Sequence, residues 1–246
     1  MGQIVDAYCT PGTERETRLS PDELLRVMDE AGIDRAVIAP EDREIAVDNM
    51  AGNARMLDLS GRSDGRFVPA CTANPWRGPS GCEMVRQAVT DGARMLVLSP
   101  MLQGFIPTDE VTDPLLKLAG ELRLPVYIHT GPHSTGAPSQ VVLLAERFGD
   151  TRFILGHCGS TDYAADMPVV LEIAPPNVWF ELSLVRPFAM PTYDGTVDEG
   201  RLIFGTSAPR NAPGVELEHF DRTWPIAEHP GTYGQNISAL LAEVRS

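Results

Sequence analysis

Five polar side chains stand where short apolar runs of this sequence end. His129 closes the run "PVYIH", His157 follows "FILG", Tyr8 and Thr10 lie in "IVDAYCT", and Ser207 lies in "FGTSAP". Histidine changes charge near neutral pH, so two histidines in one site could act as general acid and base. A serine hydroxyl beside a histidine is the start of a nucleophile–base pair. We therefore predict that His129, His157, Tyr8 and Ser207 are catalytic.

Two features limit this interpretation. A nucleophile–base pair also needs a third group that orients the base, and Asp6 is the only acidic residue in the first apolar run. Buried polar groups must be paired, so Tyr8 and Ser207 could simply be hydrogen-bond partners for the two histidines. A purely structural role for these residues is therefore the alternative.

The apolar runs predict eight strands separated by helices. The helical pattern is clearest at Pro21–Ala31, where Ser20 and Glu23 form a capping box and Gly32 follows the end. The predicted strands are Ile4–Ala7, Ala36–Ala39, Phe67–Cys71, Arg94–Leu98, Pro125–His129, Phe153–Gly156, Val178–Leu182 and Leu202–Gly205. The other predicted helices are Glu83–Asp91, Asp113–Leu122, Ser139–Phe148, Ala164–Ile173 and Gln235–Arg245.

This alternation predicts an α/β fold, a (β/α)8 TIM barrel that forms one domain over residues 1–246. Strands spaced by roughly 30 residues suit one βα unit each, and eight such units close a barrel. An open doubly wound sheet is the alternative, but no glycine fingerprint follows the first strand.

In a TIM barrel the functional groups gather at the C-terminal ends of the strands. Besides the residues above, that end would hold Ser99, His133, Arg186 and Arg210. An arginine can bind a carboxylate through two parallel hydrogen bonds. We therefore predict that Arg186 and Arg210 bind substrate, together with Thr10, Ser99 and the barrel mouth around them.

Charge and composition exclude several classes of protein. The formal net charge is −14 and the isoelectric point is near 4.7, which disfavours nucleic-acid binding. The sequence has no apolar stretch long enough to span a membrane and no visible signal peptide, so we expect a cytoplasmic protein with no membrane partner. The four cysteines show no metal-binding spacing, and we expect reduced thiols.

The lysine content removes further mechanisms. Lys117 is the only lysine among the 20 basic residues, and it lies in the helical pattern "DPLLKLAGEL". A Schiff-base or pyridoxal-phosphate enzyme needs a desolvated lysine in its site, which this position does not predict. No P-loop motif is present either.

The sequence resembles the amidohydrolase superfamily, in particular the amidohydrolase-related group that includes aminocarboxymuconate-semialdehyde decarboxylase. The resemblance covers nearly the whole chain and rests on several segments in barrel order. These are "GARMLVLSPMLQGFIPTDE", "ELRLPVYIHTG", "TRFILGHCG", "RLIFGTSAP" and "YGQNISALL". It implies a TIM barrel whose members act on small carboxylates, lactones and amides.

The resemblance also implies one divalent metal, held by a HxH pair after strand one, a histidine after strand five and an aspartate after strand eight. His129 matches the strand-five ligand, and His157 matches a strand-six histidine that handles protons or substrate. Tyr8 and Thr10 replace the HxH pair, and Ser207 replaces the aspartate. A catalytic zinc usually needs three protein ligands.

We therefore expect no cofactor, with His129 and His157 as the residues that would bind a metal such as zinc if one were present. Cys9 and Cys158 are the nearest soft ligands, but neighbouring residues on a strand point to opposite faces. If Tyr8 and His157 point inward, both thiols point away.

Two functions follow. The first is a metal-independent hydrolase, lyase or decarboxylase for a small carbonyl or carboxylate compound that uses histidine acid–base chemistry. The second is a non-catalytic member of the family that serves as a ligand-binding or partner subunit, because fold does not imply function. We favour the enzyme, with a small molecule as its partner and a homodimer as a possible assembly.

Overall fold

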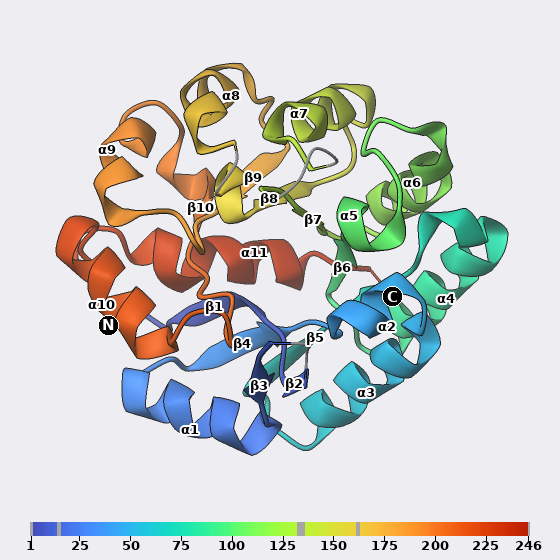
Figure 1. The fold of residues 1–246 in the computed structure, drawn as a ribbon, viewed down its shortest axis with the longest axis horizontal. Coiled ribbons are helices and arrows are strands. Elements are labelled where there is room, and N and C mark those ends of the chain that lie inside the picture. Colours follow the sequence, from blue (N-terminus) through green and yellow to red (C-terminus); the bar gives the residue numbers. More distant parts are fainter. Residues whose placement is uncertain (1, 14–15, 132–135, 161–162, 246) are drawn as a thin grey trace.

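A computed structural model describes residues 2–13, 16–131, 136–160 and 163–245 of the chain (Figure 1). His133, which the sequence placed at the barrel mouth, lies outside the described residues. Eight parallel strands form one sheet in the order β1, β4, β5, β6, β7, β8, β9 and β10. They are β1 (Val5–Cys9), β4 (Arg35–Ile38), β5 (Phe67–Thr72), β6 (Met95–Leu98), β7 (Val126–His129), β8 (Phe153–Gly156), β9 (Val178–Glu181) and β10 (Leu202–Ile203).

The first and last strands meet and close the barrel. The amide of Ala7 donates to the carbonyl of Phe204 over 3.1 Å, and the amide of Thr10 donates to that of Ala208 over 2.8 Å. A parallel bridge joins Cys9 to Ala208 just beyond β10. This arrangement confirms the predicted (β/α)8 TIM barrel and excludes the open sheet.

Helices surround the strands (Figure 1). They are α1 (Pro21–Ala31), α2 (Asp42–Ala46), α3 (Asn49–Gly61), α4 (Pro79–Thr90), α5 (Pro100–Gln103), α6 (Asp113–Glu121), α7 (Pro138–Arg147), α8 (Met167–Ile173), α9 (Met190–Tyr193), α10 (Pro213–Thr223) and α11 (Asn236–Ala242). The bounds of α1 are as predicted, and it has the predicted capping box at Ser20 and a left-handed Gly32 at its end. The predicted ranges of α4, α6, α7, α8 and α11 overlap the observed helices, but α3 and α10 were not predicted. A short antiparallel pair, β2 (Gly12–Thr13) and β3 (Arg18–Leu19), follows β1.

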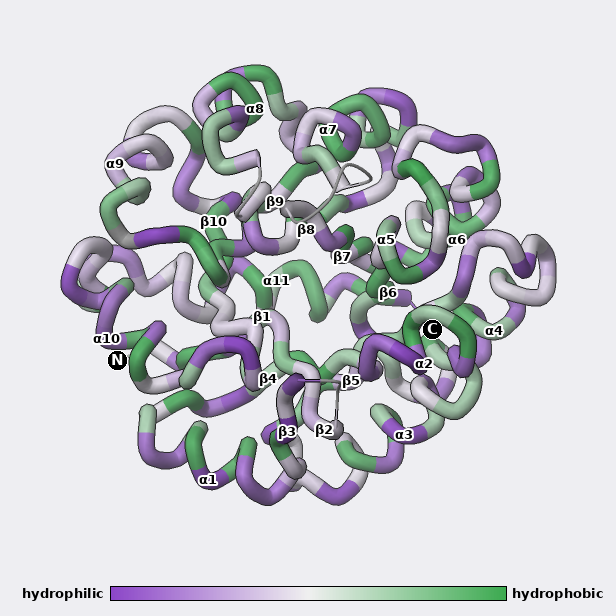
Figure 2. The backbone as a smooth tube through the Cα atoms, viewed as in Figure 1, coloured by the Kyte–Doolittle hydropathy of each residue, from purple (hydrophilic) through white to green (hydrophobic). Residues whose placement is uncertain are grey.

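Two apolar clusters hold the barrel together. The larger lies between the strands and the outer helices, and the smaller fills the barrel interior with residues such as Val37, Val97 and Ile154. Ile237 and Leu240 of α11 belong to the interior cluster, so α11 covers one end of the barrel. In Figure 2 α1 alternates between hydrophobic and hydrophilic segments, as expected of a helix with one buried face.

The other end of the barrel carries the polar residues.

None of the helices in the described part of the chain combines the length and apolar character that crossing a bilayer requires.

Candidate active site

Two tyrosines and two histidines pack together inside the C-terminal end of the barrel. Tyr127 and His129 lie two residues apart on β7 and so point to the same side of the sheet. The ring of Tyr8 stacks on that of Tyr127 with centroids 4.5 Å apart, and it meets His129 edge-on at 5.0 Å. The ring of His157 lies 5.1 Å from that of His129.

A continuous chain of hydrogen bonds runs from Tyr8 through the two histidines to a serine and a glutamate. The hydroxyl of Tyr8 lies 2.8 Å from Nε2 of His129, and Nδ1 of His129 lies 3.2 Å from Nε2 of His157. Nδ1 of His157 lies 2.7 Å from Oγ of Ser183, which donates to Oε2 of Glu181 over 2.8 Å. Each histidine is therefore engaged through both of its ring nitrogens.

Glu181 ends this chain as a fully buried carboxyl group. Oε2 also accepts from the hydroxyl of Tyr127 over 2.7 Å and from the amide of His157 over 3.0 Å, and Oε1 accepts from the amide of Ser183 over 2.8 Å. Burial raises the pKa of Glu181 to about 7, although these four donors pull the pKa down.

The turn after β8 places His157 against Glu181. His157 and Cys158 both have left-handed backbone angles, with φ of 63° and 45°, which non-glycine residues adopt rarely and at a cost. Gly156 precedes them, where a Cβ atom would lie 2.3 Å from Cε1 of Tyr127. The close approach of the Tyr127 ring therefore requires a glycine at position 156, and strained backbone geometry like that of His157 and Cys158 tends to cluster at functional sites.

Burial keeps both histidines neutral. Burial, with a smaller effect from the positive charge of Arg210, lowers the pKa of His129 to about 3, even though one edge of the ring reaches a cavity. Burial lowers the pKa of His157 well below its usual value, with smaller effects from His129 and Arg210. Near neutral pH each ring thus has one N–H donor and one acceptor nitrogen.

The histidines form part of the wall of a cavity of about 180 Å³ at the barrel mouth. Its wall also contains Ser99, Asp42 and Arg210, which follow β6, β4 and β10. This volume is below the roughly 300–1,000 Å³ of pockets for drug-sized ligands, so a ligand in it must be small. Arg210 is exposed and supplies a positive charge at the cavity.

The structure brings six of the eight residues expected to act in the site to the same end of the barrel, but only four of them line the cavity. His129, His157, Ser99 and Arg210 line the cavity, and Tyr8 is bonded to His129. Thr10 is also at this end of β1, but its hydroxyl donates to the carbonyl of Ala208 over 3.4 Å.

Ser207 and Arg186 do not line this cavity. Ser207 is buried with a left-handed backbone (φ 57°), and its amide donates to the carbonyl of Tyr8. Neither histidine bonds to it, since Ser183 holds the position beside His157. The serine in contact with a histidine is therefore Ser183 and not the predicted Ser207.

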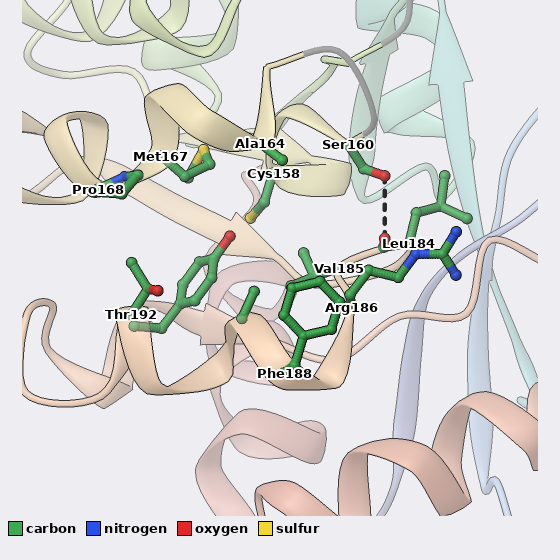
Figure 3. Close-up of a pocket in the computed structure, with 12 residues that line it drawn as sticks. Cys158, Ser160, Ala164, Met167, Pro168, Leu184, Val185, Arg186, Phe188 and Thr192 are labelled. Carbon is green, nitrogen blue, oxygen red and sulfur yellow. Dashed lines mark hydrogen bonds between the residues drawn. The ribbon is translucent and has the colours of Figure 1, made fainter.

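Arg186 belongs to a second pocket of about 270 Å³, which is mainly apolar (Figure 3). Met167, Val185 and Phe188 line it together with Cys158 (Figure 3). Leu184 lines both pockets and stands between them.

Among the described residues, the donor atoms at the mouth do not form the metal site that the resemblance implies. Within the described residues, no group of three or more His, Cys, Asp or Glu side chains is placed to hold a metal ion. Nε2 of His129 faces the Tyr8 hydroxyl instead, and the Thr10 hydroxyl faces a carbonyl. Cys9 cannot complete a site, because its thiol donates to Oδ2 of Asp6 over 3.0 Å.

Asp6 is the acidic residue that the sequence offered as an orienting group. It bonds to Thr206 instead, accepting from its hydroxyl over 2.5 Å and from its amide over 2.9 Å. The carboxyl group that orients His157, through Ser183, is that of Glu181. The sequence signal for this arrangement was a glutamate and a serine two residues apart at the end of a buried strand. The sequence held no signal for the contact between Glu181 and Tyr127.

Restoring the ligands tests the alignment with the family. We expect the triple change Tyr8→His, Thr10→His and Ser207→Asp to create zinc or manganese affinity, because it returns three ligands beside His129. Calorimetric titration of the purified protein with each metal measures this. The same triple variant with His129→Asn is the control and should bind much more weakly. Equal binding by both variants would mean that the metal lies outside this site.

Comparisons with known proteins agree with this architecture. The family model described as Amidohydrolase matches residues 11–243. No curated protein matches the chain. Among solved structures, 2,6-dihydroxybenzoate decarboxylase from Rhizobium has a TM-score of 0.78 at 15% identity, covering 98% of this chain and 99% of that chain.

Two further structures show the same fold. 5-Carboxyvanillate decarboxylase from Novosphingobium aromaticivorans, with bound manganese, has a TM-score of 0.79 at 14% identity and covers 98% of this chain and 97% of that chain. A structure from Acinetobacter baumannii named as a probable 2-pyrone-4,6-dicarboxylic acid hydrolase, with citric acid bound, has a TM-score of 0.72 at 13% identity, covering 98% of this chain and 100% of that chain. Because the family model spans most of the sequence, this chain belongs to the amidohydrolase family.

Proposed function

We propose that this chain is an enzyme that hydrolyses, decarboxylates or otherwise cleaves a small carbonyl or carboxylate compound by histidine acid–base chemistry, without the divalent metal of the family. The observation that carries the proposal is the bonded pair of neutral histidines in the wall of a small cavity. A neutral imidazole can both accept and donate a proton, which general acid–base catalysis requires.

The positive charge of Arg210 supports a carboxylate substrate, although Asp42 lies on the same cavity wall. Arg210 can pair with a carboxylate, and the hydroxyl of Ser99 on the same wall can donate a hydrogen bond. The names of the similar structures point the same way, since they include decarboxylases of 2,6-dihydroxybenzoate and 5-carboxyvanillate. The cavity volume of about 180 Å³ limits the substrate to a small molecule.

An activity screen tests this function. Chelator-treated protein would be assayed on small carboxylates, lactones and amides, with decarboxylation followed as released CO₂ and hydrolysis as released acid. We expect His157→Asn to lower kcat by about 10²–10⁴-fold, the usual contribution of a general acid or base. Arg210→Gln should mainly raise KM, because it removes a group that binds the substrate without transferring a proton.

Three outcomes contradict the proposal. Unchanged turnover in His157→Asn would remove its acid–base role. Activity that disappears with chelator and returns with added metal would contradict metal independence. Binding of carboxylates without turnover would favour the non-catalytic ligand-binding protein instead.

A further inference from the structure

We propose that Ser183 and Glu181 are positioning residues that hold both histidines in the Nδ1-protonated form, so that Nε2 of His129 is the acceptor for the hydroxyl proton of Tyr8. The tautomers are a property of the folded chain alone. Their catalytic consequence rests on the function proposed above.

The direction of the hydrogen bonds is set at Glu181. Two of its four donors are the backbone amides of His157 and Ser183, which can only donate. An ionised carboxylate can only accept, so above the pKa of Glu181 the hydroxyls of Ser183 and Tyr127 must also point toward it. The single proton of the Ser183 hydroxyl is thereby committed to Glu181.

The same direction then passes along the chain. Oγ of Ser183 has only lone pairs left for His157, so Nδ1 of His157 carries the hydrogen. A neutral imidazole has one N–H, which leaves Nε2 of His157 as an acceptor. Its partner is Nδ1 of His129 at 3.2 Å, which must therefore donate.

Nε2 of His129 is left as the acceptor that faces the hydroxyl of Tyr8 at 2.8 Å. If the proton moves, the O–H bond of Tyr8 breaks and an N–H bond forms on His129, giving a phenolate and an imidazolium with no change in total charge. The imidazolium keeps its second N–H bonded to Nε2 of His157. This order of acid, base and orienting group follows the logic of a catalytic triad.

The tautomers can be measured directly. The full chain with ¹⁵N-labelled histidine would be studied by NMR at about pH 8.5, above the pKa of Glu181 near 7. Protonated and unprotonated ring nitrogens give well-separated ¹⁵N resonances, and His129→Asn and His157→Asn assign the signals. We expect a protonated Nδ1 and an unprotonated Nε2 on both rings. A protonated Nε2 on either ring in the unaltered protein would overturn the inference without any variant of Ser183.

Variants test the assigned role. We expect Ser183→Ala to shift His157 and His129 toward mixed tautomers and to lower kcat at least tenfold, with KM within about twofold, because the substrate-binding wall is unaltered. Ser160→Ala is the matched control: it also removes a buried hydroxyl, one that donates to the carbonyl of Leu184 (Figure 3). It should leave both tautomers unchanged.

Unchanged tautomers in Ser183→Ala would refute the positioning role. The two proposals can fail separately. Mixed tautomers in the unaltered protein, if that protein is an active enzyme, would overturn the inference alone. The expected tautomers in an unaltered protein without any turnover would overturn the proposed function alone.

Discussion

Replacing Glu181 by leucine is expected to lower the free energy of unfolding by about 3–5 kcal/mol at about pH 6. The side chain is fully buried and accepts four hydrogen bonds. Leucine has a similar size but accepts none, so the four buried donors lose their partner. Urea denaturation followed by circular dichroism measures the change.

The size of this effect depends on which donors can turn away. The hydroxyls of Tyr127 and Ser183 can rotate, and both lie within reach of Nδ1 of His157. The amides of His157 and Ser183 are fixed by the backbone, and each buried donor left without a partner costs about 1–3 kcal/mol. The cost of the two unpaired amides, together with the loss of the hydrogen bonds to Glu181, gives the expected value of about 3–5 kcal/mol.

A surface glutamate provides the control for this prediction. Glu218 is exposed on α10 and pairs with Arg222 one turn later. We expect Glu218→Leu to change the free energy of unfolding by no more than about 0.5 kcal/mol. If Glu181→Leu cost as little as this control, Glu181 could not be the anchor of the hydrogen-bonded chain.

The fold could be predicted from the sequence because each βα unit is local. A short apolar run followed by an amphipathic pattern identifies a strand and its helix without reference to the rest of the chain. The ends of the strands were predicted less accurately. The last strand was predicted as Leu202–Gly205 but ends at Ile203, since the amide of Phe204 donates to the carbonyl of Thr232 instead.

In the first strand, the alternation of polar residues is a misleading guide to which side chains share a face. Asp6, Tyr8 and Thr10 occupy every second position, which predicts one shared face. The pairing of β1 with β4 shifts register between Asp6 and Cys9. As a result Tyr8 packs in the barrel interior, while Asp6 bonds to Thr206 and Cys9.

The histidines were predictable as strand-end residues, but their partners were not. His157 meets Glu181 because two consecutive residues adopt left-handed angles after β8, and nothing in "GHCG" requires that conformation. The bond between Ser183 and His157 spans 26 residues and depends on the neighbouring positions of β8 and β9. Contacts of this kind arise from the closed barrel and have no local signature.

The second large effect concerns pH. We expect the unaltered protein to gain about 3 kcal/mol of stability relative to Glu181→Gln as the pH falls from about 7.5 to about 4.5. Burial raises the pKa of Glu181 from 4.5 to about 7, so over this range the folded protein binds a proton that the unfolded chain does not. That contribution is complete below the unfolded pKa and is lost as the pH rises through the folded one. Glutamine does not titrate, and urea denaturation of both proteins at several pH values measures the difference.

The histidines act in the opposite direction over nearly the same range. The pKa values of His129 and His157 are lowered in the folded protein. Below about pH 6.5 the unfolded chain therefore binds protons that the folded protein does not bind, and stability falls as the pH falls. Glu181 therefore offsets part of the acid sensitivity that the histidine pair creates, and Glu181→Gln should unfold more steeply as acid is added. Glu218→Gln, on the exposed surface of α10, is measured in parallel as the control substitution. A difference between the unaltered protein and Glu181→Gln that stays constant with pH would show that Glu181 ionises in the folded protein as it does in the unfolded chain.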